Sequence, residues 1–143
     1  MKVLVIGAGN MGLTYAEGMS KSKLLKKKNI MVMDKSDEKL NELHQISHFD
    51  TFKELKDCVP KADIIFVAVK PHHAEELFKD INLLVTSDQI LISIMAGVTL
   101  DAIQEFSGIN KVIRAMPNLP AKVGLGLTSY VASSDISRIE LLT

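Results

Sequence analysis

Short apolar runs alternate along the chain with longer segments in which apolar residues recur at helical spacing. The runs are rich in valine and isoleucine and predict five β-strands, at residues 3–6, 30–33, 64–69, 90–94 and 112–116. The intervening segments predict helices at about residues 10–20 and 36–44, from near Pro71 and from near Thr99. Strands that alternate with helices in this way form a parallel sheet covered on both faces. The pattern predicts an α/β fold with a doubly wound parallel sheet.

A further strand and helix are predicted between the second and third of these strands. A weaker apolar segment near Ile46 predicts a short strand. Residues 51–54, Thr-Phe-Lys-Glu, have the spacing of a capping box, in which threonine and glutamate side chains cap the first helical turn. We therefore expect a helix to open at Thr51.

The last residues predict another helix. After residues 133–135, Ser-Ser-Asp, the apolar residues Ile136, Ile139 and Leu142 begin a stripe at helical spacing. The stripe reaches Thr143 without a helix stop signal. We therefore expect residues 1–143 to be the first domain of a longer protein, with this helix leading into the next domain.

The composition narrows the classes of function. Apolar residues make up 47% of the 143 residues and charged residues 24%, with 17 basic and 17 acidic side chains. These values are typical of one globular domain. A net charge of zero gives no general attraction to nucleic acid, and a lysine cluster between residues 21 and 28 suits the end of a helix. We therefore expect no nucleic-acid partner.

The chain carries neither a membrane segment nor an extracellular pattern of cysteines. No apolar run is long enough to cross a bilayer, and residues 1–6 lack the length and cleavage site of a signal peptide. The single cysteine, Cys58, cannot form an internal disulfide or a site of several thiolates, and we expect it to be packed. These features predict a cytoplasmic protein with no membrane partner.

The firmest candidate for chemistry is the loop Gly7-Ala8-Gly9-Asn10-Met11-Gly12. It follows the first predicted strand directly and opens the first predicted helix. In this context the G-x-G-x-x-G spacing gives a tight turn and lets backbone N–H groups approach a pyrophosphate at the helix N-terminus. The loop therefore predicts a Rossmann-type dinucleotide-binding domain, which spans residues 1–143.

Asp34, at the end of the second predicted strand, bears on which dinucleotide binds. It lies 22 residues after Gly12 (34 minus 12), close to the spacing of a carboxylate that holds an adenosine ribose. A carboxylate accepts hydrogen bonds from a 2′-hydroxyl and repels a 2′-phosphate, which favours NAD(H). Lys35 and Ser36 could instead hold that phosphate and favour NADP(H). The sequence leaves both cofactors open.

Unusual residues follow the three later strands of the predicted sheet. Ligands of an open parallel sheet bind outside the carboxyl ends of its strands. We therefore expect one crevice, lined by the glycine loop, Asp34 and the segments Val69-Lys70-Pro71, Met95-Ala96-Gly97 and Met116-Pro117-Asn118. In this crevice Lys70 offers a cation, and Asn118 offers an amide that could orient a nicotinamide or a substrate.

The sequence predicts no metal site and no catalytic nucleophile. His72 and His73 are adjacent, so on a helix they point in different directions and do not form an i, i+4 pair of metal ligands. Together with His44 and His48 they are expected to be surface or packing residues. Since neither a nucleophile elbow nor a Walker loop occurs, no catalytic residue is assigned.

Four stretches of the sequence resemble one known enzyme family. They read Ile-Gly-Ala-Gly-Asn-Met-Gly at residues 6–12, Val-Ala-Val-Lys-Pro at 67–71, Ser-Ile-Met-Ala-Gly-Val-Thr at 93–99 and Val-Ile-Arg-Ala-Met-Pro-Asn-Leu-Pro-Ala at 112–121. Together they resemble pyrroline-5-carboxylate reductase, and the likeness extends over the whole chain. The resemblance implies an NAD(P)-binding domain, followed by an all-helical domain that builds the dimer and much of the substrate pocket. It also implies an activity that reduces a cyclic imine to proline, with the helical domain absent from this chain.

Carried over by position, the resemblance assigns roles to individual residues. Residues 7–12 would hold the pyrophosphate, and the region of Asp34 would meet the adenosine ribose. Ala68, Lys70 and Ala96 would contact the rest of the dinucleotide, and Asn118 would lie near the nicotinamide and the imine. The resemblance slightly favours NADP over NAD. We expect the chain alone to bind cofactor weakly and to show little or no reductase activity.

Two departures from the family pattern keep a dinucleotide-sensing paralogue open as one of three alternatives. Leu119 stands where threonine is usual, and Met95 where a small residue is common. The alternatives are a related hydroxy-acid dehydrogenase domain, a dinucleotide-sensing paralogue without catalysis, and an S-adenosylmethionine methyltransferase. Residues 116–118 argue against the first of these, and the later strand ends fit the last one poorly.

Overall fold

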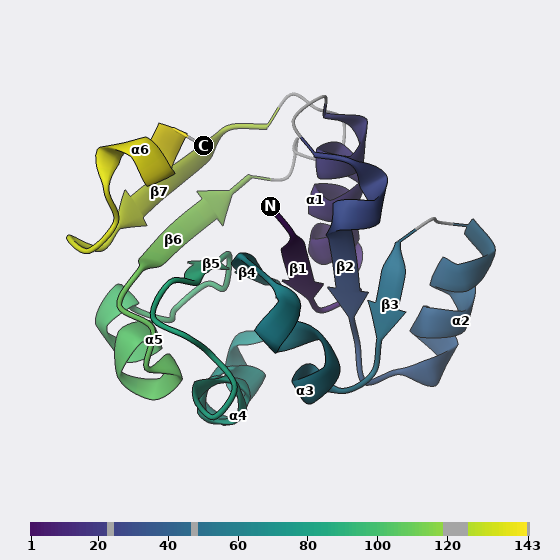
Figure 1. The fold of residues 1–143 in the computed structure, drawn as a ribbon, viewed down its shortest axis with the longest axis horizontal. Helices are drawn as coiled ribbons and strands as arrows, with labels where there is room; N and C mark the ends of the chain where they lie inside the picture. The colour runs from purple at the N-terminus through teal and green to yellow at the C-terminus, as the bar shows by residue number, and fades with distance from the viewer. Residues whose placement is uncertain (23–24, 47–48, 119–125, 143) are drawn as a thin grey trace.

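The strands of the computed structural model form one seven-stranded sheet, in the order β3-β2-β1-β4-β5-β6-β7 (Figure 1). The model describes residues 1–22, 25–46, 49–118 and 126–142. The strands are β1 (Val3–Ile6), β2 (Ile30–Met33), β3 (Asp50–Phe52), β4 (Ile64–Val67), β5 (Ile90–Ser93), β6 (Val112–Pro117) and β7 (Thr128–Ala132). The first six pair in parallel, and β7 runs antiparallel to β6. The predicted Rossmann-type α/β sheet is confirmed, and its order reverses between β1 and β4.

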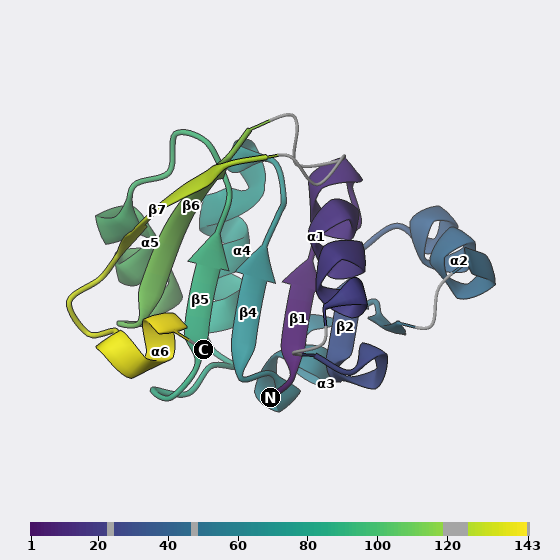
Figure 2. The ribbon, with the colours of Figure 1, turned by 90° about the horizontal axis from the view of Figure 1, so that it is seen from above.

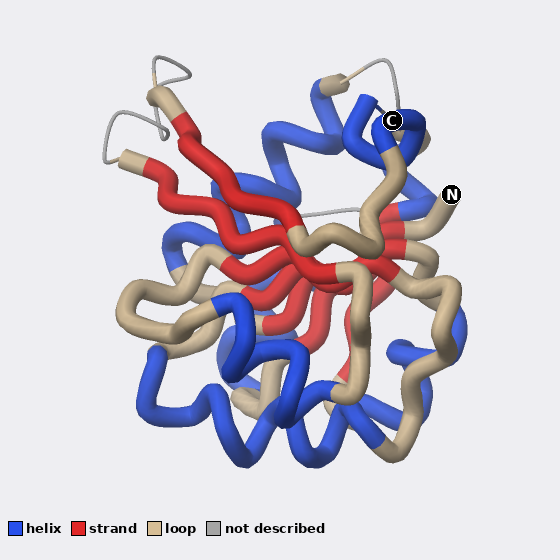
Figure 3. Tube along the Cα trace, turned by 90° about the vertical axis from the view of Figure 1, so that its left-hand side faces the viewer, coloured by secondary structure: helices blue, strands red, loops and turns tan. Residues whose placement is uncertain are grey.

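Helices lie on both faces of this sheet. They are α1 (Asn10–Lys21), α2 (Asp37–Ile46), α3 (Leu55–Cys58), α4 (Ala74–Asn82), α5 (Leu100–Ser107) and α6 (Arg138–Leu142). Short 3-10 turns are η1 (Lys27–Asn29), η2 (Val59–Lys61) and η3 (Pro71–His73). Figure 2 shows α1 and α6 in front of the sheet and α4 and α5 behind it, and Figure 3 shows the strands running between helices above and below. None of the described helices is both long and apolar enough to span a membrane.

The alternation of side chains along the central strand divides the core between the two faces. Every residue of β1 is buried. Leu4 packs in a cluster with Phe78 of α4, whereas Val5 packs in a second cluster with Ala16 of α1. Since successive side chains of a strand point to opposite faces, the continuous apolar run of β1 is what a strand covered on both sides requires.

The predicted strand near Ile46 and the helix predicted to open at Thr51 are wrong. Ile46 ends α2, and the strand of this region is β3, which pairs through Thr51 with Val32 of β2. The Thr51 hydroxyl lies 2.7 Å from Nε2 of His44 rather than capping a helix, and α3 begins four residues later. Pairing with the sheet edge prevails here over the local capping pattern, because it satisfies the backbone groups of three residues at once.

The sequence pattern also missed β7. This strand pairs antiparallel with β6, and its register joins Pro117 to Thr128 and Ile113 to Ala132. Four of its five residues are exposed, so it carries no apolar run that would reveal it. The prediction of a purely parallel sheet is therefore corrected at this edge.

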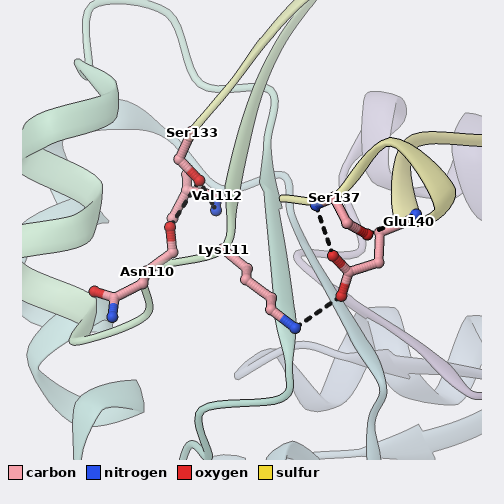
Figure 4. Close-up of polar contacts among 6 residues, drawn as sticks. All are labelled: Asn110, Lys111, Val112, Ser133, Ser137 and Glu140. Atoms are coloured by element: carbon pink, nitrogen blue, oxygen red, sulfur yellow. Dashed lines mark hydrogen bonds and ion pairs between the residues drawn. The ribbon is translucent and has the colours of Figure 1, made fainter. Parts of the chain in front are cut away.

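The final helix begins later than residues 133–135 predict. Ser137 and Glu140 form a capping box: the Glu140 N–H donates to Ser137 Oγ at 3.2 Å, and the Ser137 N–H donates to Glu140 Oε2 at 2.8 Å. The other carboxylate oxygen of Glu140 accepts from Nζ of Lys111 at 2.7 Å (Figure 4). This ion pair ties α6 to the start of β6.

Ser133 fastens the same end of the β6–β7 pair. Its hydroxyl donates to the Asn110 carbonyl at 2.7 Å and accepts from the Val112 N–H at 3.0 Å (Figure 4). Its own N–H donates to the Val112 carbonyl at 2.8 Å. A residue predicted to open a helix instead joins two strands.

Acid should release α6. Hydrogen bonds from Lys111 and Ser137 lower the pKa of the Glu140 carboxyl from 4.5 to about 2. A carboxyl group whose pKa is lowered by folding stabilises the fold fully at a pH above its ordinary pKa of 4.5. That stabilisation is lost as the pH falls from 4.5 towards 2. We expect the backbone amide NMR signals of residues 138–142 to move towards random-coil positions over this pH range.

The variant Glu140→Gln should show these shifted signals already at pH 6, and Glu42→Gln, on an exposed position of α2, should leave them unchanged. Signals of α6 that stay native from pH 6 to pH 2 would contradict this role of Glu140.

Candidate functional site

The glycine loop joins β1 to α1 through two contacts that exclude any side chain. Gly7 has a φ of 103°, and a Cβ on it would lie 2.7 Å from the carbonyl oxygen of Ala68, at the end of β4. A Cβ on Gly12 would collide with the carbonyl oxygen of Gly7. The first turn of α1 therefore packs directly on the loop, and the loop packs directly on the β4 strand end.

Gly9 has the opposite surroundings. A Cβ built on this residue meets nothing within 4 Å. Gly9 is also the N-cap of α1, where it provides no side-chain hydrogen bond to the first turn. Open space thus lies over a helix N-terminus whose backbone N–H groups carry partial positive charge, which suits an anionic group such as a pyrophosphate.

Asp34 lies beside this loop at the end of β2. Its Oδ2 accepts from the Ala8 N–H at 2.8 Å, and its Oδ1 accepts from the Ser36 N–H at 2.9 Å. Nζ of Lys39, in the first turn of α2, lies 3.5 Å from Oδ2. Only 13% of the Asp34 side chain is exposed. The carboxylate is therefore held in one orientation between the loop and α2.

These groups surround one pocket with a volume of about 510 Å³, within the range of small-molecule sites. It lies at the carboxyl ends of β1, β2 and β4, where the order of the sheet reverses. The residues that line it are Ile6, Gly7, Gly9, Met33, Asp34, Lys35, Lys39, Ala68, Val69, Lys70, His73, Glu76 and Leu77.

Several lining residues were not predicted, because they come from helices rather than strand ends. Lys39 is in the first turn of α2, and Glu76 and Leu77 are in the first turn of α4. His73 was predicted to be a surface or packing residue, but it ends the turn before α4 and lines the pocket. The signal that could have found them is their place at the start of a helix that follows a predicted strand end.

The other predicted residues lie around the pocket rather than in its lining. Ala8 and Ser36 contribute backbone N–H groups to Asp34. Asn10 and Met11 begin α1, and Pro71 begins η3.

Ala96 and Gly97 are exposed in the loop after β5. This loop follows the same edge of the sheet, two strands from β1. The structure thus brings the glycine loop, Asp34 and residues 68–70 together, and leaves residues 96 and 97 further along the edge.

The two remaining pocket candidates have structural partners. Oδ1 of Asn118 accepts from the Leu127 N–H at 3.1 Å, and the Asn118 N–H donates to the Leu127 carbonyl at 3.3 Å, which closes the β6–β7 pair. Met95 is only 2% exposed and belongs to the core on the α4 side, so it fills the core rather than the crevice. Leu119 lies outside the described residues.

The cysteine and histidine side chains of the described residues form no further reactive site. No group of histidine, cysteine and acidic side chains in this part of the chain could hold a metal ion. Cys58 is buried, as predicted, and burial raises the pKa of its thiol to about 11, so that it stays protonated at neutral pH. The imidazole rings of His72 and His73 lie against each other, with 4.0 Å between their centroids.

Comparison with known sequences gives a consistent set of relatives. The pyrroline-5-carboxylate reductase of Escherichia coli (strain K12) is 37% identical over 137 residues, which are 95% of this chain and 51% of that protein. That of Aquifex aeolicus (strain VF5) is 33% identical over 141 residues, 98% of this chain and 51% of that protein. The chain thus spans about half the length of the curated relatives it matches.

Solved structures of the same kind share the fold. A pyrroline-5-carboxylate reductase from Coxiella burnetii superposes with a TM-score of 0.91 at 26% identity, over 99% of this chain and 53% of that one. The Plasmodium falciparum pyrroline carboxylate reductase with NADP bound superposes with a TM-score of 0.86 at 25% identity, over 99% and 52%. The resemblance stated from the sequence is confirmed.

A family model described as "NADP oxidoreductase coenzyme F420-dependent" matches residues 2–97. This range contains every residue that lines the pocket. Because the match extends over more than half of the sequence, the chain belongs to this family of oxidoreductases, and within it resembles the first half of pyrroline-5-carboxylate reductases.

Proposed function

We propose that this chain is the NAD(P)H-binding domain of an enzyme that reduces 1-pyrroline-5-carboxylate to L-proline. The observation that carries the cofactor part is the open space over Gly9, between an uncapped helix N-terminus and the fixed Asp34 carboxylate. The reaction itself is supported by similarity to a reductase of this name, which is 37% identical to this chain over 95% of its length.

The pocket offers a distinct partner for each part of a dinucleotide. Backbone N–H groups of residues 9–12 would bind the pyrophosphate at the start of α1. Asp34 would accept hydrogen bonds from the adenosine ribose, and Lys35 and Ser36 flank it. The path towards the nicotinamide would be lined by the residues that follow β4, which are Ala68, Val69 and Lys70. The nicotinamide itself would lie further along the strand ends, near Pro71, Ala96, Gly97 and Asn118.

The chain would contribute binding and orientation rather than acid–base chemistry. Hydride transfer from nicotinamide C4 to the carbon of a C=N bond needs the two groups to be held face to face. The remaining half of the protein would bind the imine.

The surface supports a division of the protein into two domains. Residues 1–143 would be the dinucleotide-binding domain, and an all-helical domain would complete the imine site and form the homo-oligomer. Large apolar side chains are exposed on β7 and α6, at Tyr130, Val131, Ile139 and Leu142, where a second domain would cover them. The buried thiol of Cys58 suits the reducing cytoplasm.

A chimera tests the proposed reaction. The 143-residue chain alone should bind NAD(P)H weakly without measurable reduction of pyrroline-5-carboxylate, since half of the substrate site would be missing. Joined to the second half of the E. coli reductase, it should oxidise NAD(P)H in the presence of pyrroline-5-carboxylate and not of a 3-hydroxy acid. Absorbance at the nicotinamide band measures both reactions.

Two outcomes would contradict the proposal. Robust turnover by the isolated chain would show that no second domain is required. A folded chimera that binds NAD(P)H but reduces no imine would instead favour a dinucleotide sensor.

Paired glycine variants test the cofactor site. The Cβ of Gly9→Ala enters open space, so it should change the free energy of unfolding by no more than about 1 kcal/mol but weaken NAD(P)H binding about tenfold or more. The Cβ of Gly12→Ala collides with the Gly7 carbonyl, so this variant should lower the free energy of unfolding by about 3 kcal/mol.

Urea unfolding measures the change in stability, and calorimetric titration measures the change in cofactor affinity. The matched control is Gly18→Ala, because its Cβ also meets open space but lies within α1, away from the loop. Unchanged cofactor affinity in Gly9→Ala would argue against a pyrophosphate over the loop.

A further inference from the structure

We infer that this site selects NAD(H) over NADP(H), and that Asp34 sets the preference. The inference rests on the proposed cofactor function and concerns the adenosine end of the same pocket. It separates this chain from the Plasmodium relative, whose structure holds NADP.

Asp34 cannot turn away from a ligand in this pocket. Each of its two carboxylate oxygens accepts a backbone N–H, one from Ala8 in the glycine loop and one from Ser36 at the start of α2. The side chain is 13% exposed, so solvent screens its charge only in part. A 2′-phosphate on the adenosine ribose would therefore meet a fixed negative charge.

The hydrogen-bonding capacity that Asp34 retains suits a hydroxyl. An ionised carboxylate accepts at about four lone-pair sites, and the two backbone N–H groups use one on each oxygen. The free sites can accept from ribose hydroxyls, which donate. A phosphate dianion brings acceptors only, so it would remove these bonds and add repulsion.

Charge alone does not decide the preference, since Lys35, Lys39, Lys70, Asp34 and Glu76 all line the pocket. The preference depends instead on how each of these charged groups is placed. The three lysines are exposed, so their attraction to a phosphate is screened by solvent and salt. Among the five, the Asp34 carboxylate is the group held between backbone donors.

Lys39 cannot reverse this preference without a cost. Its ammonium lies 3.5 Å from Asp34 Oδ2 and already compensates that charge. A 2′-phosphate could attract Lys39 only by drawing it away from Asp34, which would leave the carboxylate without its cation. The nearby Lys53 is itself paired with Asp37 at 2.8 Å.

The test uses the 143-residue chain with two whole dinucleotides and with two ligands that lack the nicotinamide. Calorimetric titrations compare NADH with NADPH, and ADP-ribose with its 2′-phosphate. We expect the ligand without the 2′-phosphate to bind about tenfold tighter or more in each pair.

Asp34→Asn should lower this ratio towards one or below, because it removes the charge; its amide nitrogen cannot accept, so one of the two backbone hydrogen bonds is lost as well. Lys39→Met keeps Asp34 and both of its backbone bonds but removes the compensating cation, so it should raise the ratio. Lys28→Met makes the same charge change at an exposed position before β2 and should leave the ratio unchanged. Circular dichroism establishes that each variant is folded.

The outcomes separate this inference from the function on which it rests. If none of the four ligands binds the folded chain, the proposed cofactor function fails. If all bind but the phosphorylated ligands bind as tightly or more tightly, the preference is overturned while the cofactor function stands. If the wild-type ratio is unchanged in both Asp34→Asn and Lys39→Met, Asp34 is not the determinant.

Discussion

The close packing of the first turn of α1 on the loop that ends β1 is the contact on which the pocket depends. Gly12 lies so near the Gly7 carbonyl that no side chain fits between them. This contact brings the positive end of α1 over the end of the central strand. It also sets the position of Ala8, whose N–H reaches Asp34 on the neighbouring strand.

Three strands are locked to one another at this point. The Ala8 N–H joins the end of β1 to the end of β2 through Asp34, and Gly7 packs against the carbonyl of Ala68 at the end of β4. Because these contacts are made between groups of the chain itself, they hold the walls of the pocket in place. Preorganisation of this kind lowers the entropy lost when a flexible dinucleotide is bound.

The far edge of the sheet is built on different interactions. Ser133 holds β7 to β6 through three hydrogen bonds, and the Lys111–Glu140 pair holds α6 to the start of β6. These polar contacts fix the backbone, while large apolar side chains of β7 and α6 are left exposed. The pocket is thus a property of strands β1, β2 and β4, and the opposite edge presents a surface suited to further protein.

Local sequence was sufficient for the regular elements and for the first wall of the site. The strand runs, the glycine spacing and Asp34 depend on side-chain periodicity and on neighbours along the chain, so the parallel α/β sheet and the loop–Asp34 pair were predictable. The capping-box spacing is present at residues 51–54 and at residues 137–140, and of these two segments only the second caps a helix. At the first, pairing with β2 prevails, and no local pattern reports that a strand edge lies within reach.

Tertiary structure alone decided the contacts between residues distant in sequence. β7 lacks the buried apolar pattern of the other strands, because four of its five residues are exposed, and its pairing with β6 is seen only in the fold. Asn118 was predicted from its place after a strand, yet its amide bonds to Leu127. Lys39, Glu76 and Leu77 reach the pocket because helices α2 and α4 pack beside it. Side-chain patterns along the chain specify the kind of fold and the chemistry of the loop, whereas packing decides how Asp34 is held and which side chains surround it.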